Sequence, residues 1–124
     1  MSISTKKVLI IDDDSRNIFA LTAVLKAKGY QCLSAVSAQQ GLDILSTDAE
    51  VGVVLMDMMM PEMDGYQAIA KMKQDEELKD VPVIAVTAQA MVGDRERCLN
   101  AGANGYVSKP VNVDELVLLL KNHI

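Results

Sequence analysis

Cysteine, histidine and aromatic residues are scarce in this sequence of 124 residues. It has two cysteines, one histidine, three tyrosines, one phenylalanine and no tryptophan. Cys32 and Cys98 form no CxxC pair, and with His123 as the single imidazole the chain has too few ligands for a zinc site. The N-terminus shows no signal-peptide pattern, so we expect both thiols to be free and buried rather than joined in a disulfide.

Long hydrophobic runs and an excess of positive charge are also lacking. No apolar run approaches the roughly 20 residues that a membrane helix needs. Twelve basic and seventeen acidic residues give a net charge of −5, and such a surface repels nucleic acid backbones. The hydrophobic residues, 50% of the chain, suffice for one compact core. The composition therefore predicts a single cytoplasmic domain with no nucleic acid or membrane partner.

Five short runs predict β-strands. Three of them are almost entirely apolar and end abruptly, which is typical of parallel strands buried on both faces. These are Val8–Ile11, Val51–Met56 and Val83–Val86. Two weaker, part-polar runs, Gln31–Val36 and Gly105–Ser108, suit the edges of a sheet.

Helical patterns fill the intervals between these runs. A first apolar stripe ends before Gly29, and a later helix is expected over Met91–Ala101 with its end at Gly102. Capping boxes, in which a short polar residue precedes a Gln or Glu by three positions, mark other helix starts. They are Ser37 with Gln40, Asp64 with Gln67 and Asn112 with Glu115.

Five strands alternating with five helices predict one α/β domain over residues 1–124. Crossover connections of this length imply right-handed βαβ units, and no repeat or linker interrupts them. The predicted architecture is a doubly wound, five-stranded parallel sheet with helices on both faces. Ligands of such sheets bind at the carboxyl ends of the strands, so the residues that follow each strand are the candidates for a site.

Polar residues follow four of the predicted strands. Asp12 and Asp13 follow the first strand, Asp57 the third, Thr87 the fourth and Lys109 the fifth. Clustered carboxylates repel one another unless a cation neutralises them, and ligands that are all oxygen select a hard cation such as Mg²⁺. A lysine and a hydroxyl that face a metal-bound carboxylate form a site for a phosphoryl group on that carboxylate.

Four segments of the chain resemble receiver domains of two-component response regulators. They are Val8–Asp14, Asp57–Gly65, Val86–Ala88 and Ser108–Pro110, and they occur in the order and at the spacing of that family. The Asp57–Gly65 segment is the most specific of the four. The resemblance covers essentially the whole chain and implies the flavodoxin-like strand order 2-1-3-4-5.

Carried over residue by residue, the resemblance implies a phosphoacceptor and a metal site. Asp57 would receive the phosphoryl group from a histidine kinase or a histidine phosphotransfer protein. Asp12, Asp13, Asp57 and the backbone carbonyl of Met59 would hold Mg²⁺, with Mn²⁺ as a substitute. Such a domain promotes its own phosphorylation and slow autodephosphorylation, but it is a signalling domain rather than an enzyme. Asp14, the third acid of the run, is interpreted as a helix cap.

The resemblance also implies a switch. Lys109, whose bond to Pro110 is expected to be cis, and Thr87 would contact phosphoryl oxygens. The ring of Tyr106 would turn inward as Thr87 moves toward the phosphate. This would change the face formed by the fourth helix, the fifth strand and the fifth helix, which would meet a downstream protein target. The domain is expected to be a monomer or a weak dimer.

Other features leave alternatives open. The resemblance implies that Met59 and Gln89 flank the site and tune how fast water removes the phosphate. Neither side chain is a carboxylate that could activate water, so we do not expect an extremely short phosphate lifetime. A cluster of methionines is interpreted as flexible core filling rather than a soft-metal site; its members are Met56, Met58, Met59, Met60 and Met63. The segments Ala88–Met91 and Gly93–Cys98 resemble receivers of hybrid histidine kinases, so a free-standing regulator and an excised receiver both fit.

Two other classes of protein use an aspartate nucleophile or a doubly wound sheet. A Mg²⁺-dependent phosphatase of the haloacid-dehalogenase type needs a second acid two residues after the nucleophile, where Met59 stands. A flavodoxin-like nucleotide binder needs a glycine-rich loop after the first strand, where this chain has Asp12, Asp13 and Asp14. The sequence favours the receiver over both.

Overall fold

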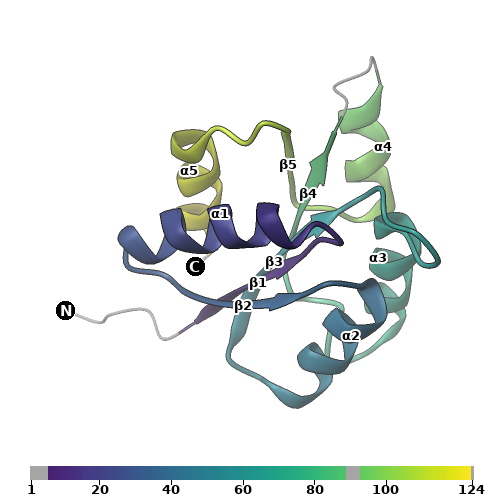
Figure 1. Ribbon diagram of the computed structural model, residues 1–124. Coiled ribbons are helices and arrows are strands. Elements are labelled where there is room, and N and C mark those ends of the chain that lie inside the picture. The colour runs from purple at the N-terminus through teal and green to yellow at the C-terminus, as the bar shows by residue number, and fades with distance from the viewer. Residues whose placement is uncertain (1–5, 89–92, 124) are drawn as a thin grey trace.

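The chain folds into a five-stranded parallel sheet with helices on both faces (Figure 1). The computed structural model describes residues 6–88 and 93–123. The strand order is β2-β1-β3-β4-β5, which confirms the predicted fold class and order. The strands are β1 (Lys7–Ile11), β2 (Gln31–Ala35), β3 (Val51–Asp57), β4 (Val83–Thr87) and β5 (Gly105–Ser108).

Two layers of helices enclose the sheet (Figure 1). α1 and α5 cover one face, and α2, α3 and α4 cover the other. The helices are α1 (Ser15–Ala27), α2 (Ala38–Thr47), α3 (Gly65–Gln74), α4 (Asp94–Ala101) and α5 (Val113–His123). None of the helices in the described part of the chain is long and apolar enough to cross a membrane.

The core lies in two parts because successive strand residues point to opposite faces of the sheet. In β1, Val8 and Ile10 belong to the cluster that contains the buried side chains of α1 and α5. Leu9 and Ile11 belong to the cluster on the α2 and α3 side. The central strands are therefore buried on both faces, which explains why their sequences read as near-continuous apolar runs.

The predicted capping residues begin their helices, but one capping box differs from the prediction. Asp64 and Gln67 form the complete box at α3, with hydrogen bonds of 2.9 and 3.0 Å. Ser37 caps α2 by accepting from the Gln40 N–H, yet the Gln40 side chain accepts from the Val36 N–H at 2.8 Å. The predicted reciprocal bond of Gln40 is therefore wrong, because its side chain reaches past the cap residue to Val36, the residue that follows β2.

The other helix ends and the two cysteines agree with the sequence only in part. Asn112 accepts from the Glu115 N–H at 3.0 Å and so caps α5, and both Gly29 and Gly102 have positive φ. The start of α4 that was predicted at Met91 lies outside the described residues, and α4 runs from Asp94. Both thiols are free, but only Cys98 is buried; Cys32 is half-buried because it lies on the edge strand β2.

Candidate functional site

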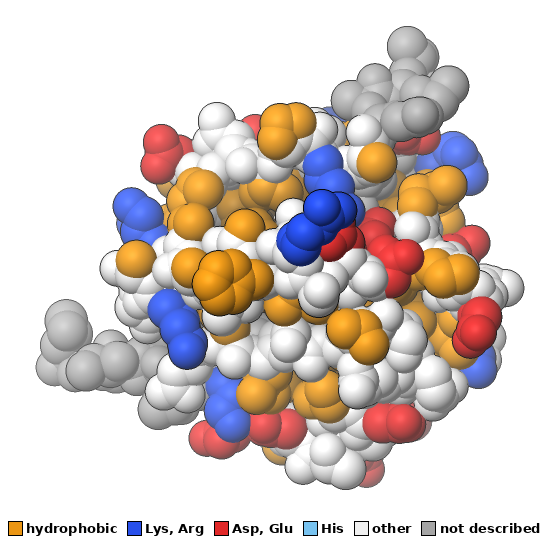
Figure 2. All heavy atoms as spheres, in the orientation of Figure 1, with side chains coloured by type: hydrophobic (Ala, Val, Ile, Leu, Met, Phe, Trp, Pro, Cys, Tyr) orange, Lys and Arg blue, Asp and Glu red, His pale blue; other side chains and the backbone are white. Residues whose placement is uncertain are grey.

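The carboxyl ends of four adjacent strands bring the predicted polar residues to one edge of the sheet. Asp12 follows the last residue of β1, Asp57 and Thr87 are the last residues of β3 and β4, and Lys109 follows β5. Because the strands are parallel and neighbours in the sheet, all four residues lie at the same edge. Figure 2 shows acidic side chains beside basic ones on the surface over this edge.

Three carboxylates form the centre of the site. Asp12, Asp13 and Asp57 each offer a carboxylate oxygen, and these oxygens lie within 4.8 Å of one another. Asp12 and Asp57 are only 2% and 4% exposed, whereas Asp13 is exposed. The three negative charges repel one another, and the burial of two of them strengthens this repulsion because little water screens them. A hard divalent cation would relieve the repulsion. The donor set, oxygen alone, fits Mg²⁺.

Hydrogen bonds orient the two buried carboxylates. Asp57 Oδ1 accepts from the Met59 N–H at 3.0 Å, and Asp12 Oδ1 accepts from the Asp14 N–H at 2.8 Å. The ammonium of Lys109 lies 3.2 Å from Asp12 Oδ2 and 3.7 Å from Asp57 Oδ2. The lysine thus faces the second oxygen of both carboxylates and supplies part of the neutralising charge.

Burial and charge shift the ionisation of Asp57 and Lys109. Burial raises the pKa of Asp57 to about 6; the Met59 N–H and Lys109 oppose this shift, and Asp12 adds to it. Burial by itself lowers the pKa of Lys109, but the charges of Asp57 and Asp12 outweigh burial, so the net pKa is raised. Lys109 is therefore an ammonium at neutral pH, and Asp57 is a carboxylate held at a free-energy cost.

The loop after Asp57 is held by close contact with the start of α3. A Cβ atom on Gly65 would lie 2.5 Å from the Met58 sulfur, 2.7 Å from Met58 Cα and 3.0 Å from the Asp57 carbonyl oxygen. Only glycine therefore lets α3 approach the backbone of residues 57 and 58 this closely. This packing holds the backbone of Asp57 and Met58 against the start of α3.

Thr87 and Tyr106 are in direct contact. The Thr87 hydroxyl, in a residue only 4% exposed, donates to the Tyr106 hydroxyl at 3.3 Å. Tyr106 comes from the neighbouring strand β5 and packs half-buried against the core on the α2 and α3 side. The predicted switch residues are therefore neighbours, and Thr87 lies between Tyr106 and the acidic cluster in strand order. Gln89, the second predicted flanking residue, lies outside the described residues.

The methionines near the site divide into buried and exposed members. Met56, Met58 and Met60 are buried, as core filling requires, whereas Met59 is 70% exposed. The interpretation as core filling is wrong for Met59, because the chain turns outward after Asp57 and leaves this side chain at the surface. The Lys109–Pro110 peptide bond is cis, as the resemblance implied, and Asp14 caps α1 by accepting from the Arg16 N–H.

One residue of the site was not identified from the sequence. Asn17, in the first turn of α1, donates from its side-chain amide to Asp12 Oδ2. A signal for it exists in the sequence, since Asn17 lies five residues after Asp12 and one turn into a helix that follows the acids. Its direction could not be read from spacing alone, because the loop between β1 and α1 sets which side of the helix faces the carboxylates.

Comparison with known proteins agrees with this geometry. A sequence model of the response regulator receiver domain matches residues 8–121. The chain belongs to this family. Receiver domains are signalling domains of two-component systems. The match confirms the family resemblance inferred from the sequence, and similar solved structures confirm the predicted fold and strand order.

Relatives above 30% identity include a response regulator and a receiver domain of a histidine kinase. The polar-differentiation response regulator DivK of Brucella ovis is 37% identical over 120 residues, which cover 97% of each chain. The receiver domain of the sensor histidine kinase PA1611 from Pseudomonas aeruginosa is 33% identical, with a TM-score of 0.86 over 95% of this chain and 96% of that one. That structure was solved with a magnesium ion coordinated in its active-site cleft.

A more distant structure supports the fold of the receiver domain. The chemotaxis protein CheY4 of Vibrio cholerae has a TM-score of 0.87 at 22% identity, and the alignment covers 97% of this chain and 99% of that one. At this identity the likeness concerns the fold alone. The relatives thus include a response regulator and a receiver from a histidine kinase, the two settings that the sequence left open.

Proposed function

We propose that this receiver domain accepts a phosphoryl group on Asp57 from a histidine kinase or histidine phosphotransfer protein. The observation that carries the proposal is the meeting of three carboxylates with Lys109 and Thr87 at one edge of the sheet. A free-standing regulator and a kinase-linked receiver would share this chemistry. In either setting the domain works as a cytoplasmic switch, as a monomer or a weak dimer.

Asp57 is the nucleophile in this proposal. Its Oδ1 is engaged by the Met59 N–H, so we assign the attack to Oδ2, which lies toward Lys109. A bond forms between this oxygen and phosphorus while the phosphorus–nitrogen bond of the donor phosphohistidine breaks. The electron pair stays on the imidazole nitrogen, and the product is an acyl phosphate on Asp57.

The surrounding residues provide charge and orientation. Asp12, Asp13, Asp57 and the backbone carbonyl of Met59 would hold Mg²⁺ or Mn²⁺, which supplies charge stabilisation for the phosphoryl oxygens when it is bound. Lys109 would pair with one phosphoryl oxygen and so exchange its carboxylate partners for the new anion. Met59 offers no group that could take a proton from water, which is consistent with slow autodephosphorylation.

Thr87 would pass the change on to the output surface. Its hydroxyl donates to Tyr106, and a phosphoryl oxygen at Asp57 would compete for the same proton. As Thr87 turns toward the phosphoryl group, Tyr106 loses this partner and takes a new rotamer. The face formed by α4, β5 and α5 then changes its shape, and we assign binding of the downstream protein target to this face.

Labelling with acetyl phosphate tests the proposal. Wild-type protein should gain one hydroxylamine-labile phosphoryl group in Mg²⁺ and none in excess EDTA. Asp57→Asn should remove the labelling because the nucleophile is gone. Asp80→Asn, which changes an exposed acid on the α3–β4 connection, should label like wild type. Labelling of Asp57→Asn at the wild-type level would show that another residue is the acceptor.

A further inference from the structure

Asp12 is held from two separate parts of the chain. Its Oδ1 accepts from the backbone N–H of Asp14, and its Oδ2 accepts from the side-chain amide of Asn17. The first donor lies in the loop after β1, and the second lies on α1. Because each oxygen accepts from at least one donor, the plane of the carboxylate is fixed about its bond to the rest of the side chain. Asp12 is 2% exposed, so water contributes little to its orientation.

The two donors at Asp12 Oδ2 differ in charge. Lys109 lies 3.2 Å from this oxygen and is a cation, so it competes with any metal ion for the carboxylate. Asn17 is neutral, so it can satisfy a lone pair and orient the carboxylate while leaving the negative charge available to a cation. A metal ligand that is already oriented loses less conformational freedom on binding.

The local helix does not itself require asparagine at this position. Asn17 is the third residue of α1, and its backbone N–H bonds to the Asp14 carbonyl at 3.1 Å whatever its side chain is. Asparagine is a poorer helix former than alanine, and Asp14 already provides the cap. The contact that the Asn17 side chain makes in the structure is therefore with the acidic cluster.

From these contacts we infer that Asn17 is a positioning residue for the cation site, acting through Asp12. The inference rests on the proposed function only in taking Asp12 to be a metal ligand. Asn17 touches neither the phosphoryl group nor the metal in this assignment. Its contribution is to hold the Asp12 carboxylate in the orientation that binds the cation and to keep that orientation when Lys109 leaves Asp12.

Titration of the unphosphorylated protein with Mg²⁺ alone tests the inference. Asn17→Ala and Asn17→Leu should each raise the Kd for Mg²⁺ by about tenfold to a hundredfold, as removal of an outer-sphere partner typically does. Leucine has the same number and branching of side-chain heavy atoms as asparagine but lacks the donor, and alanine lacks both the donor and the bulk, so the pair separates hydrogen bonding from packing. Ser15→Ala, at an exposed position in the same helical turn, is the matched control and should leave the Kd unchanged.

Two further readouts distinguish positioning from a general structural role. In EDTA, both Asn17 variants should melt within a few degrees of wild type, and at saturating Mg²⁺ their labelling by acetyl phosphate should approach the wild-type rate. A Kd within twofold of wild type in either Asn17 variant would overturn the inference. If wild-type protein itself bound no Mg²⁺, the proposed function would fail instead, so the two failures are distinguishable.

Discussion

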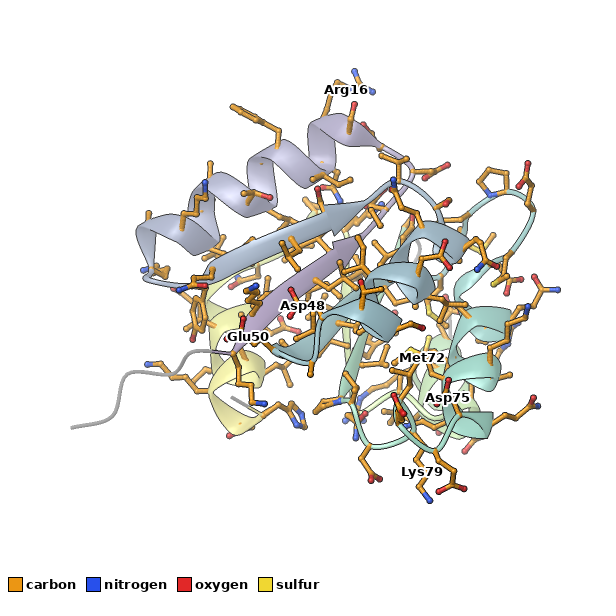
Figure 3. All side chains as sticks on the ribbon, turned by 90° about the horizontal axis from the view of Figure 1, so that it is seen from below. Arg16, Asp48, Glu50, Met72, Asp75 and Lys79 are labelled. Carbon is orange, nitrogen blue, oxygen red and sulfur yellow. The ribbon has the colours of Figure 1, made fainter. Side chains whose placement is uncertain are left out.

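The two ends of the sheet carry similar groups in opposite surroundings. At the carboxyl end, Lys109 lies 3.2 Å from Asp12 and 3.7 Å from Asp57, and the acid side chains are only 3% and 4% exposed. At the other end, Lys7 lies 2.9 Å from Asp48 and 3.3 Å from Glu50, with side chains that are 24% and 61% exposed. Figure 3 labels Asp48 and Glu50 at that end, and Arg16 of α1 at the end that holds the site.

The shorter contacts belong to the more exposed cluster. Water and salt screen the charges around Lys7, so these ion pairs are an ordinary surface feature. The bonds from Lys7 and from the Glu50 N–H lower the pKa of Asp48, while burial raises that of Asp57 to about 6. One cluster is thus satisfied by its own partners. The other holds more negative charge than its lysine can balance, as a site for a cation and a phosphoryl group requires.

Replacing each lysine with methionine should give the largest difference in stability between the two clusters. In EDTA, Lys109→Met should lower the free energy of unfolding by about 1 to 3 kcal/mol, because buried carboxylates lose their cation. Mg²⁺ should restore much of the loss. Lys7→Met should have only a small effect, and Mg²⁺ should not reverse it. Urea unfolding with and without Mg²⁺ measures both variants. Equal losses of unfolding free energy in EDTA would contradict the claim that negative charge is left unbalanced only at the carboxyl end.

The two clusters should also respond to pH with opposite signs. The folded pKa of Asp57 is raised, so its contribution to stability is full below about pH 4 and is lost as the pH rises through about 6. The folded pKa of Asp48 is lowered, so its contribution is present above its ordinary pKa and is lost as the pH falls.

Substituting each acid separates these contributions. In EDTA between pH 4 and 7, Asp57→Asn should gain stability relative to wild type as the pH rises, by on the order of 1 to 2 kcal/mol. Asp48→Asn should instead be less stable than wild type throughout this range, and its deficit should shrink only as the pH falls below about 4, where wild type loses the contribution of Asp48. A difference between wild type and Asp57→Asn that stays constant with pH would mean that burial does not shift the ionisation of Asp57.

A third, smaller effect concerns how the structure of α4, β5 and α5 responds when Asp57 is modified at the carboxyl end of the sheet. Thr87→Ala should still accept phosphate on Asp57, yet lose most of the NMR shift changes that beryllofluoride causes in α4, β5 and α5. The expected reason is that the link from the site to Tyr106 passes through the Thr87 hydroxyl. Residues around Lys7 should hardly respond in either protein. A full response from Thr87→Ala would remove Thr87 from the path and leave the acceptor assignment intact.

The sequence predicted the fold and the principal residues of the site because both depend on local patterns. Buried parallel strands appear as apolar runs, and Asp12, Asp57 and Thr87 stand where those runs end. The bond from Asn17 to Asp12 and the exposure of Met59 depend on how a loop turns in space. Spacing alone could not predict these two features.

The central claim is that Asp57 receives the phosphoryl group in a reaction that requires a divalent cation. The most direct measurement treats the intact protein with acetyl phosphate, with Mg²⁺ or with EDTA, and maps the acyl phosphate by borohydride reduction and peptide mass spectrometry. The account predicts one modified residue, Asp57, in Mg²⁺, and none in EDTA. Modification at Asp12 or Asp13, or equal modification of Asp57 in EDTA, would contradict it.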